Sequence, residues 1–168
     1  MNADIQNTSL RLAFYGDDFT GSTDALEVLA FAGLKCALFL KPPTAEELKS
    51  LGGYDAIGVA GDSRGMSPLE MDQELPFIFN ALNDLGPKVV HYKVCSTFDS
   101  TSAGNIGPVA DALLDRLGAD FCCVTPAFPE NGRTVYKGHL FVGDVLLSES
   151  GMRNHPLTPM TESNLVRV

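Results

Sequence analysis

Five short apolar runs mark out the first 125 positions of the chain. They cover residues 10–15, 35–40, 55–60, 89–94 and 120–125, and each is bounded by Gly, Pro, Asp or Ser. Most are too short for a helix, so they predict buried strands. A half-exposed antiparallel strand would alternate apolar and polar residues, whereas these runs are apolar throughout, which predicts a parallel sheet covered on both faces.

Segments with helical spacing lie between the runs. Ala25, Leu26, Leu29 and Ala32 follow this spacing and precede Gly33, a residue typical of helix ends. The same pattern predicts helices over residues 75–82, before Gly86-Pro87, and over residues 109–117, before Gly118. The alternation predicts an α/β fold, a doubly wound and mainly parallel sheet of about five strands with helices on both faces.

The alternation of apolar runs and helical segments ends after residue 125. Residues 134–147 carry alternating apolar side chains and two glycines, which favours a hairpin or a C-terminal β extension. The chain stops at residues 164–168 without a polar tail, as if cut there. We therefore expect a tail over residues 1–9 and a domain over residues 10–168.

Composition narrows the class of protein. The chain has 168 residues, of which 45% are hydrophobic and 20% charged, which predicts one globular domain. A net charge of -9 disfavours a nucleic-acid partner. No apolar run approaches the length that spans a bilayer, and residues 1–6 lack the pattern of a signal peptide. We therefore expect no membrane partner and a cytoplasmic location.

The cysteines and histidines show no metal-site spacing. Cys36, Cys95, Cys122 and Cys123 all lie in apolar runs without a CxxC motif, which predicts reduced core thiols. The three histidines are also too scattered to suggest a site, so no metal ligands are expected.

Polar residues cluster after four of the five predicted strands. The segments are residues 16–24 (GDDFTGSTD), 61–65 (GDSRG), 95–101 (CSTFDST) and 126–133 (PAFPENGR). The carboxyl ends of parallel strands meet at one sheet edge, where ligands bind in open α/β sheets. We therefore expect Asp17, Asp18, Arg64, Ser96, Asp99 and Arg133 to line one cleft.

The first of these segments has the outline of a phosphate-binding loop but not its chemistry. Ser22 stands where the motif has Lys, and Asp17 and Asp18 would repel phosphates. These carboxylates could hydrogen-bond sugar hydroxyls, accept a proton or hold Mg²⁺ through water. The alternative is that one of them only caps the following helix.

Three cations stand near the predicted strand ends. Arg64, Lys93 and Arg133 together favour a carboxylate or phosphate ligand, and surface ion pairs are the alternative for each. The hydroxyls of Ser96, Thr97, Ser100 and Thr101 precede a helix expected near Ala103. They could cradle an anion or cap that helix.

Four ordered segments resemble the four-carbon acid sugar kinase family. They are residues 16–24, 93–100 (KVCSTFDS), 125–134 (TPAFPENGRT) and 159–165 (PMTESNL), and the resemblance runs from Arg11 to Val168. It implies the sugar-binding N-terminal domain of an ATP-dependent kinase that phosphorylates the terminal hydroxyl of threonate, erythronate or 3-oxo-tetronate. In the family a nucleotide-binding domain follows, which would bind most of the ATP and Mg²⁺, so this chain alone is expected to be inactive.

The resemblance agrees with the candidate pocket. A sugar acid needs cations for its carboxylate and polar groups for its hydroxyls. The candidate binding residues are Asp17, Asp18, Arg64, Lys93, Ser96, Thr97, Asp99, Asn131, Gly132 and Arg133. Asp18 or Asp17 is the candidate catalytic base.

Two other functions remain open at this point. The chain could be a stand-alone sugar-acid-binding or regulatory domain without chemistry. A dinucleotide-binding domain is disfavoured because no GxGxxG motif follows the first strand.

Overall fold

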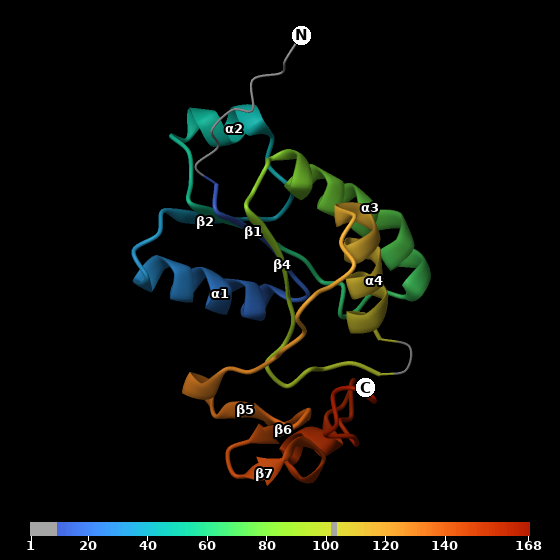
Figure 1. Ribbon diagram of the computed structural model, residues 1–168. Coiled ribbons are helices and arrows are strands. Elements are labelled where there is room, and N and C mark those ends of the chain that lie inside the picture. The colour runs from blue at the N-terminus through green and yellow to red at the C-terminus, as the bar shows by residue number, and fades with distance from the viewer. Residues whose placement is uncertain (1–9, 102–103) are drawn as a thin grey trace. The chain divides into compact units, whose positions relative to one another are not determined.

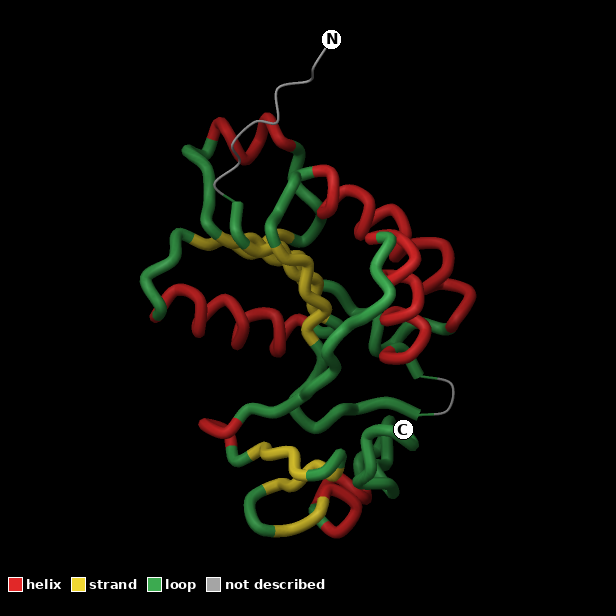
Figure 2. Tube along the Cα trace, viewed as in Figure 1, coloured by secondary structure: helices red, strands yellow, loops and turns green. Residues whose placement is uncertain are grey.

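The computed structural model describes residues 10–101 and 104–168, so the expected tail of residues 1–9 lies outside the described residues. The described chain divides into two compact units. The first unit holds the residues up to Asp62 together with Glu74–Lys93, and the second holds Ser63–Gln73 and Val94–Val168. Figures 1 and 2 show the elements of each unit.

The first unit is built on a parallel sheet with the strand order β2-β3-β1-β4. Its strands are β1 (Leu12–Gly16), β2 (Cys36–Phe39), β3 (Ala56–Ala60) and β4 (Val89–Lys93). Four of the five predicted strands are therefore confirmed, together with their parallel direction. Val89 and the other residues of β4 pair with β1, which places β4 at an edge of the sheet.

Helices cover both faces of this sheet. They are α1 (Phe19–Phe31), α2 (Ala45–Ser50) and the part of α3 (Pro68–Asp84) that begins at Glu74. The crossover from β1 to β2 and the crossover from β3 to β4 run in opposite directions, so right-handed connections place α1 and α3 on opposite faces. Figure 1 shows this arrangement. On the α3 face, the rings of Tyr15 and Phe79 meet edge to face, with centroids 5.6 Å apart.

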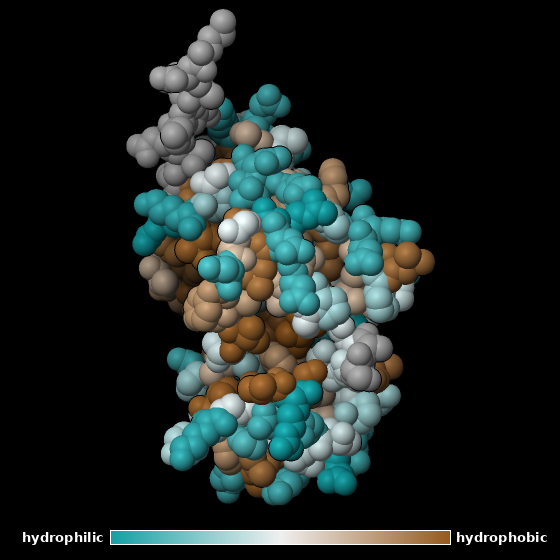
Figure 3. Space-filling view, turned by 45° about the vertical axis from the view of Figure 1, so that its right-hand side comes forward, coloured by the Kyte–Doolittle hydropathy of each residue, from teal (hydrophilic) through white to brown (hydrophobic). Residues whose placement is uncertain are grey.

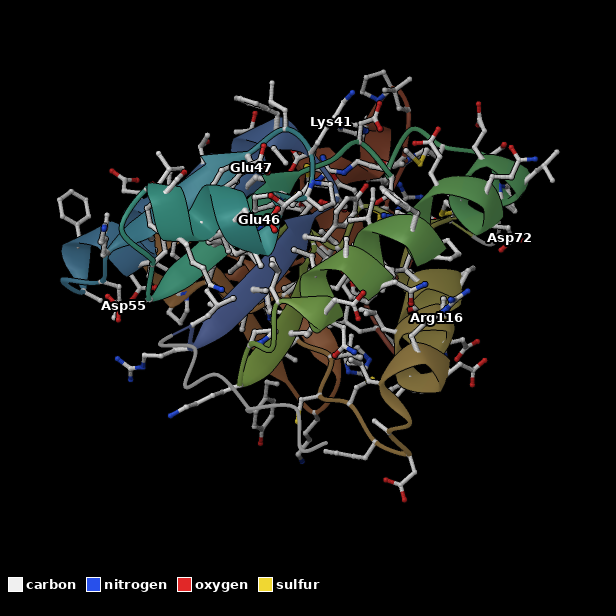
Figure 4. The ribbon with its side chains drawn as sticks, turned by 90° about the horizontal axis from the view of Figure 1, so that it is seen from above. Lys41, Glu46, Glu47, Asp55, Asp72 and Arg116 are labelled. Atoms are coloured by element: carbon white, nitrogen blue, oxygen red, sulfur yellow. The ribbon has the colours of Figure 1, made fainter. Side chains whose placement is uncertain are left out.

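The short helix α2 is absent from the prediction, although its start carries a recognisable signal. Thr44 Oγ1 accepts a hydrogen bond from the Glu47 N–H, and Glu47 Oε2 accepts one from the Thr44 N–H. This is a capping box, which satisfies two backbone donors at the start of the helix. Figure 4 labels Glu46 and Glu47 on this helix.

The second unit carries an antiparallel sheet. Its elements include α4 (Ile106–Leu117), β5 (Arg133–Tyr136), β6 (His139–Val142), β7 (Val145–Leu146) and the 3-10 helices η1 (Pro129–Asn131), η2 (Leu147–Glu149) and η3 (Gly151–Asn154). The predicted C-terminal β extension is therefore confirmed, as is the predicted helix ending before Gly118. The core of this unit consists of Phe98, Ile106, Leu140, Leu147 and Met160.

The strand predicted over residues 120–125 is wrong. Residues 121–127 have neither helical nor strand structure, and Phe121 and Val124 are exposed. Cys122 and Cys123 are also exposed, so their assignment to the core is wrong, although all four cysteines are free thiols. The reason is that an apolar, β-branched run forms a strand only when a neighbouring backbone pairs with it, and composition does not supply that neighbour.

The described surface mixes hydrophilic and hydrophobic side chains (Figure 3). Large exposed apolar residues occur in both units, among them Phe31 in the first and Leu157 in the second. Single exposed apolar residues are common in proteins and assign no site. Among the described residues, no helix is both long and apolar enough to cross a membrane.

Candidate functional site

The segment that follows β1 begins a helix with an aspartate cap. Asp18 has extended backbone geometry, and its Oδ1 accepts a 2.9 Å hydrogen bond from the Gly21 N–H. The Ser22 hydroxyl donates a 2.6 Å hydrogen bond to the Asp18 carbonyl. Asp18 therefore performs the capping role that the sequence offers as an alternative. Its side chain remains half-buried rather than fully enclosed.

Lys93, the last residue of β4, reaches the same helix start. A methyl group placed on Gly21 would lie 2.5 Å from Asp18 Oδ1 and 2.9 Å from Lys93 Nζ. The carboxylate and the ammonium therefore both occupy the space beside the Gly21 Cα. A larger residue at this position would require both of these flexible side chains to shift.

Asp17 lies deeper than Asp18. Its side chain is 1% exposed, and its backbone N–H donates a 3.0 Å hydrogen bond to the Lys93 carbonyl. Gly16 pairs in register with both Ala60 and Lys93, so the ends of β1, β3 and β4 are level. The structure thus brings Asp17, Asp18 and Lys93 together at the carboxyl edge of the parallel sheet, as predicted for that edge.

In the second unit, the turn after β4 brings three other predicted residues together. Thr97 Oγ1 donates a 2.6 Å hydrogen bond to Asp99 Oδ1. The other carboxylate oxygen of Asp99, Oδ2, lies 3.5 Å from Arg64 Nη1. Thr97 and Asp99 are buried, whereas the Arg64 side chain is 23% exposed. Arg64 is therefore the member of this group that reaches the surface.

The N-cap position of α4 is not one of the predicted hydroxyl residues. The N-cap residue is Asn105, which makes no side-chain capping hydrogen bond, and α4 begins at Ile106 rather than near Ala103, which lies outside the described residues. Ser96 is half-buried, Ser100 is buried and Thr101 is exposed. The capping interpretation stays a prediction, because the helix start expected near Ala103 lies outside the described residues.

Asn131, Gly132 and Arg133 form the end of η1 and the start of β5. Arg133 Nη1 donates a hydrogen bond to the Asn131 carbonyl, and the buried Arg133 Nε has no hydrogen-bond partner among the described residues. Because residues 120–125 form no strand, Arg133 does not follow a parallel strand. The argument that placed Arg133 at the sheet edge after a fifth parallel strand is therefore wrong.

Nine of the ten predicted site residues fall into three groups, and Ser96 lies in the second unit outside them. Asp17, Asp18 and Lys93 belong to the first unit, whereas Arg64, Thr97 and Asp99 form one network in the second, and Asn131 to Arg133 form a turn of that same unit. A single cleft lined by all of them stays a prediction. Sequence reasoning missed Gly21 as a site residue, although two glycines flanking an Asp pair were a usable signal.

The described residues contain no group of three or more His, Cys, Asp or Glu side chains arranged to hold a metal ion. The segment after β1 has Ser22 where a phosphate-binding loop has lysine, and the Ser22 hydroxyl donates a hydrogen bond to the Asp18 carbonyl. This segment therefore does not fit a phosphate-binding loop.

Comparison with known proteins defines the class of this domain. Residues 12–168 match the family model described as "Sugar-binding N-terminal domain", and the chain belongs to this family. The chain is 49% identical over 164 residues to a 3-oxo-tetronate kinase of Pseudomonas fluorescens. It is 52% identical over 157 residues to a 3-oxo-tetronate kinase of Burkholderia multivorans. These alignments cover 98% and 94% of this chain but only 38% and 36% of the relatives.

Solved structures share the fold. A structure from Salmonella typhimurium LT2 has a TM-score of 0.86 and 42% identity, and the match covers 94% of this chain and 37% of that one. A Bordetella bronchiseptica protein solved as a domain-swapped dimer with bound citrate has a TM-score of 0.74 and 29% identity. That match covers 93% of this chain and 38% of that one. The α/β fold is therefore shared with proteins more than twice as long.

Proposed function

We propose that this chain is the substrate-binding part of an ATP-dependent kinase that phosphorylates the terminal hydroxyl of a four-carbon sugar acid. The candidate substrates are 3-oxo-tetronate, threonate and erythronate. The relatives named 3-oxo-tetronate kinase support this proposal, because their matches cover nearly the whole chain. The citrate in the Bordetella bronchiseptica structure also supports a ligand with carboxylate groups.

The observation that carries the proposal is the close approach of Lys93 and Asp18 beside Gly21. A cation at a helix N-terminus is unfavourable by itself, because the helix dipole places positive potential there. The neighbouring Asp18 carboxylate offsets that cost, and together the two groups offer a hydroxyl-bearing anion both donors and acceptors. This arrangement suits a polyhydroxy acid better than an uncharged ligand.

Asp18 is the better candidate for the base that accepts the proton of the reacting hydroxyl. A base must come within hydrogen-bond reach of the proton it takes. Asp18 is half-buried and within reach of a ligand, whereas Asp17 is almost fully enclosed. We therefore assign the base to Asp18 and a supporting role to Asp17. Phosphoryl transfer depends mostly on such positioning and on charge neutralisation.

The second unit has candidate contacts of its own. Arg64 is the candidate partner of the substrate carboxylate, because its guanidinium reaches the surface and offers paired N–H donors. Arg133 is the second candidate cation. Ser96, Asn131 and the backbone of Gly132 are candidates for hydrogen bonds to the substrate hydroxyls.

ATP and Mg²⁺ belong to the remaining part of the longer protein in this proposal. The chain spans about 38% of the length of a relative named 3-oxo-tetronate kinase, so the longer protein has ample further sequence for a nucleotide-binding part. We expect this chain alone to bind the sugar acid without turning it over. A coupled assay with ATP on the 168-residue chain should therefore show no phosphorylation.

Calorimetry tests the binding part of the proposal. Threonate, erythronate and 3-oxo-tetronate are titrated into the chain, with the neutral polyol threitol as the comparison ligand. Lys93→Ala should weaken acid binding ten- to hundredfold, since a charge-assisted hydrogen bond contributes about 1.5–3 kcal/mol. Lys88→Ala, which removes an exposed lysine just before β4, should leave binding unchanged. Absence of acid binding to the wild-type chain would refute the proposal.

A further inference from the structure

The turn after β4 holds an unusual backbone conformation. Phe98 has a φ of 55°, in the left-handed region that a bulky side chain rarely adopts. Its N–H donates a 2.9 Å hydrogen bond to the Cys95 carbonyl, which closes the turn. The Phe98 side chain is 3% exposed and packs in the core with Ile106 and Leu140. Core packing therefore maintains a turn that local preference disfavours.

In this turn, side-chain hydrogen bonds connect the residues on either side of Phe98. The Thr97 hydroxyl has one proton, which it donates to Asp99 Oδ1. The 3.0 Å contact between Cys95 Sγ and Thr97 Oγ1 is therefore a hydrogen bond donated by the Cys95 thiol. Thr97 is thus engaged on both sides within the turn, rather than directed at a ligand.

Asp99 is likewise engaged within the protein. Oδ1 accepts from Thr97, and Oδ2 faces Arg64 Nη1 at 3.5 Å. The Asp99 side chain is 4% exposed, so its charge needs a partner at this position. A guanidinium carries five N–H donors, more than one carboxylate oxygen accepts. Asp99 can therefore hold one edge of Arg64 while a ligand binds another.

We infer that Asp99 is a positioning residue, which orients the Arg64 guanidinium for the substrate carboxylate, and that Thr97 acts through Asp99. This inference rests on the proposed function and changes the role of Asp99, which the sequence offers as a direct substrate ligand. An arginine held in one orientation loses less conformational freedom on binding than a mobile one. Asp99 therefore determines the preference for an acid over a neutral polyol.

The test compares two carboxylates of the second unit that each face an arginine. Asp99→Asn keeps the shape and an acceptor for Thr97 but removes the charge that holds Arg64. Glu162→Gln is the matched control, because Glu162 Oε2 lies 3.4 Å from Arg167 Nη1. We expect Asp99→Asn to weaken threonate binding about tenfold, as for a lost charge-assisted contact, and to leave threitol binding unchanged. The control should change neither.

A double-mutant cycle tests the role of Thr97 separately. Thr97→Val should weaken threonate binding in the wild-type background, and Thr97→Ser, which keeps the hydroxyl, should restore it. The effect of Thr97→Val should largely disappear in the Asp99→Asn background, because residues of one network are not additive. Additive losses would show that Thr97 contacts the ligand itself and would overturn its assigned role. Thermal unfolding of each variant checks that it is folded. If Asp99→Asn does not fold, Thr97→Val alone tests the hydrogen-bond network.

The outcomes separate this inference from the proposed function. Equal loss of acid and polyol binding in Asp99→Asn would show a direct or general structural role and overturn the inference. Wild-type affinity in Asp99→Asn, together with loss in Arg64→Ala, would also overturn it while the proposed function stands. Failure of the wild-type chain to bind any of the acids would refute both.

Discussion

The Nζ atom of Lys93 lies 2.9 Å from the point that a Cβ of Gly21 would occupy. Lys93 ends β4 and Gly21 lies in the first turn of α1, so the absence of a side chain allows an edge strand of the sheet to reach a helix start. Asp18 Oδ1 approaches the same point and also caps the helix through the Gly21 N–H. The carboxylate that caps the helix is therefore also a member of the proposed site.

Gly21→Ala should disturb this arrangement. The new methyl group would displace the Lys93 ammonium and the Asp18 carboxylate, and we expect threonate affinity to fall about tenfold, roughly the effect of one charge-assisted contact. Gly107→Ala is the control, because a Cβ there has nothing within 4 Å. This control lies in the first turn of α4 and should leave threonate affinity unchanged. Calorimetry that finds wild-type affinity in Gly21→Ala would contradict the assigned site.

Asp18 substitutions should separate the two roles of its carboxylate. Asp18→Asn keeps a good cap, so the free energy of unfolding should hardly change, whereas Asp18→Ala should lower it by about 1 kcal/mol. The turnover measurement uses this chain extended by the further sequence that its relatives have. In that longer protein, both variants should turn over substrate about a hundredfold or more slowly if Asp18 is the base. Urea unfolding and a coupled assay make the two measurements. Unchanged turnover would transfer the role of base to Asp17.

Leu140 should be a main contributor to the stability of the second unit. It is 0% exposed and belongs to the same core as Phe98. Leu140→Ala should lower the free energy of unfolding by about 2–5 kcal/mol, because it removes buried apolar contacts and leaves a cavity. Leu157, which is 84% exposed, provides the control. A comparable loss in Leu157→Ala would contradict the described core.

Stability should fall when the capping box of α2 is protonated. Hydrogen bonds from the backbone N–H and the side chain of Thr44 hold the pKa of Glu47 below its ordinary value of 4.5. A lowered pKa stabilises the folded state above 4.5, and this contribution disappears as the pH falls below 4.5 through the folded-state pKa. Glu47→Gln should therefore show a smaller loss of stability than the wild type between neutral and acidic pH.

Urea unfolding at several pH values provides that measurement. Glu46→Gln is the control, because it removes the neighbouring carboxylate of the same helical turn but leaves the Thr44 capping box in place. Its pH dependence should follow that of the wild type more closely than Glu47→Gln does. The reverse order would contradict the role of the capping box.

The sequence by itself determined the parallel sheet and the ends of α1 and α4. Apolar runs such as residues 55–60 predict strands buried on both faces, and glycines such as Gly33 and Gly118 mark helix ends by their positive φ. Both signals are local, because they depend on a few neighbouring residues and on backbone sterics. The family was equally accessible, since its motifs are continuous segments of sequence.

Only the tertiary structure decided which side chains act together. Thr97 and Asp99 are two positions apart, but their contact requires the left-handed Phe98, which the distant residues Leu140 and Met160 hold in place. The pairing of Arg64 with Asp99 also depends on the tertiary structure, as does the failure of residues 120–125 to form a strand. Which side chains and strands pair depends on groups from distant parts of the chain. The hydrophobic pattern of the sequence does not encode the positions of those groups.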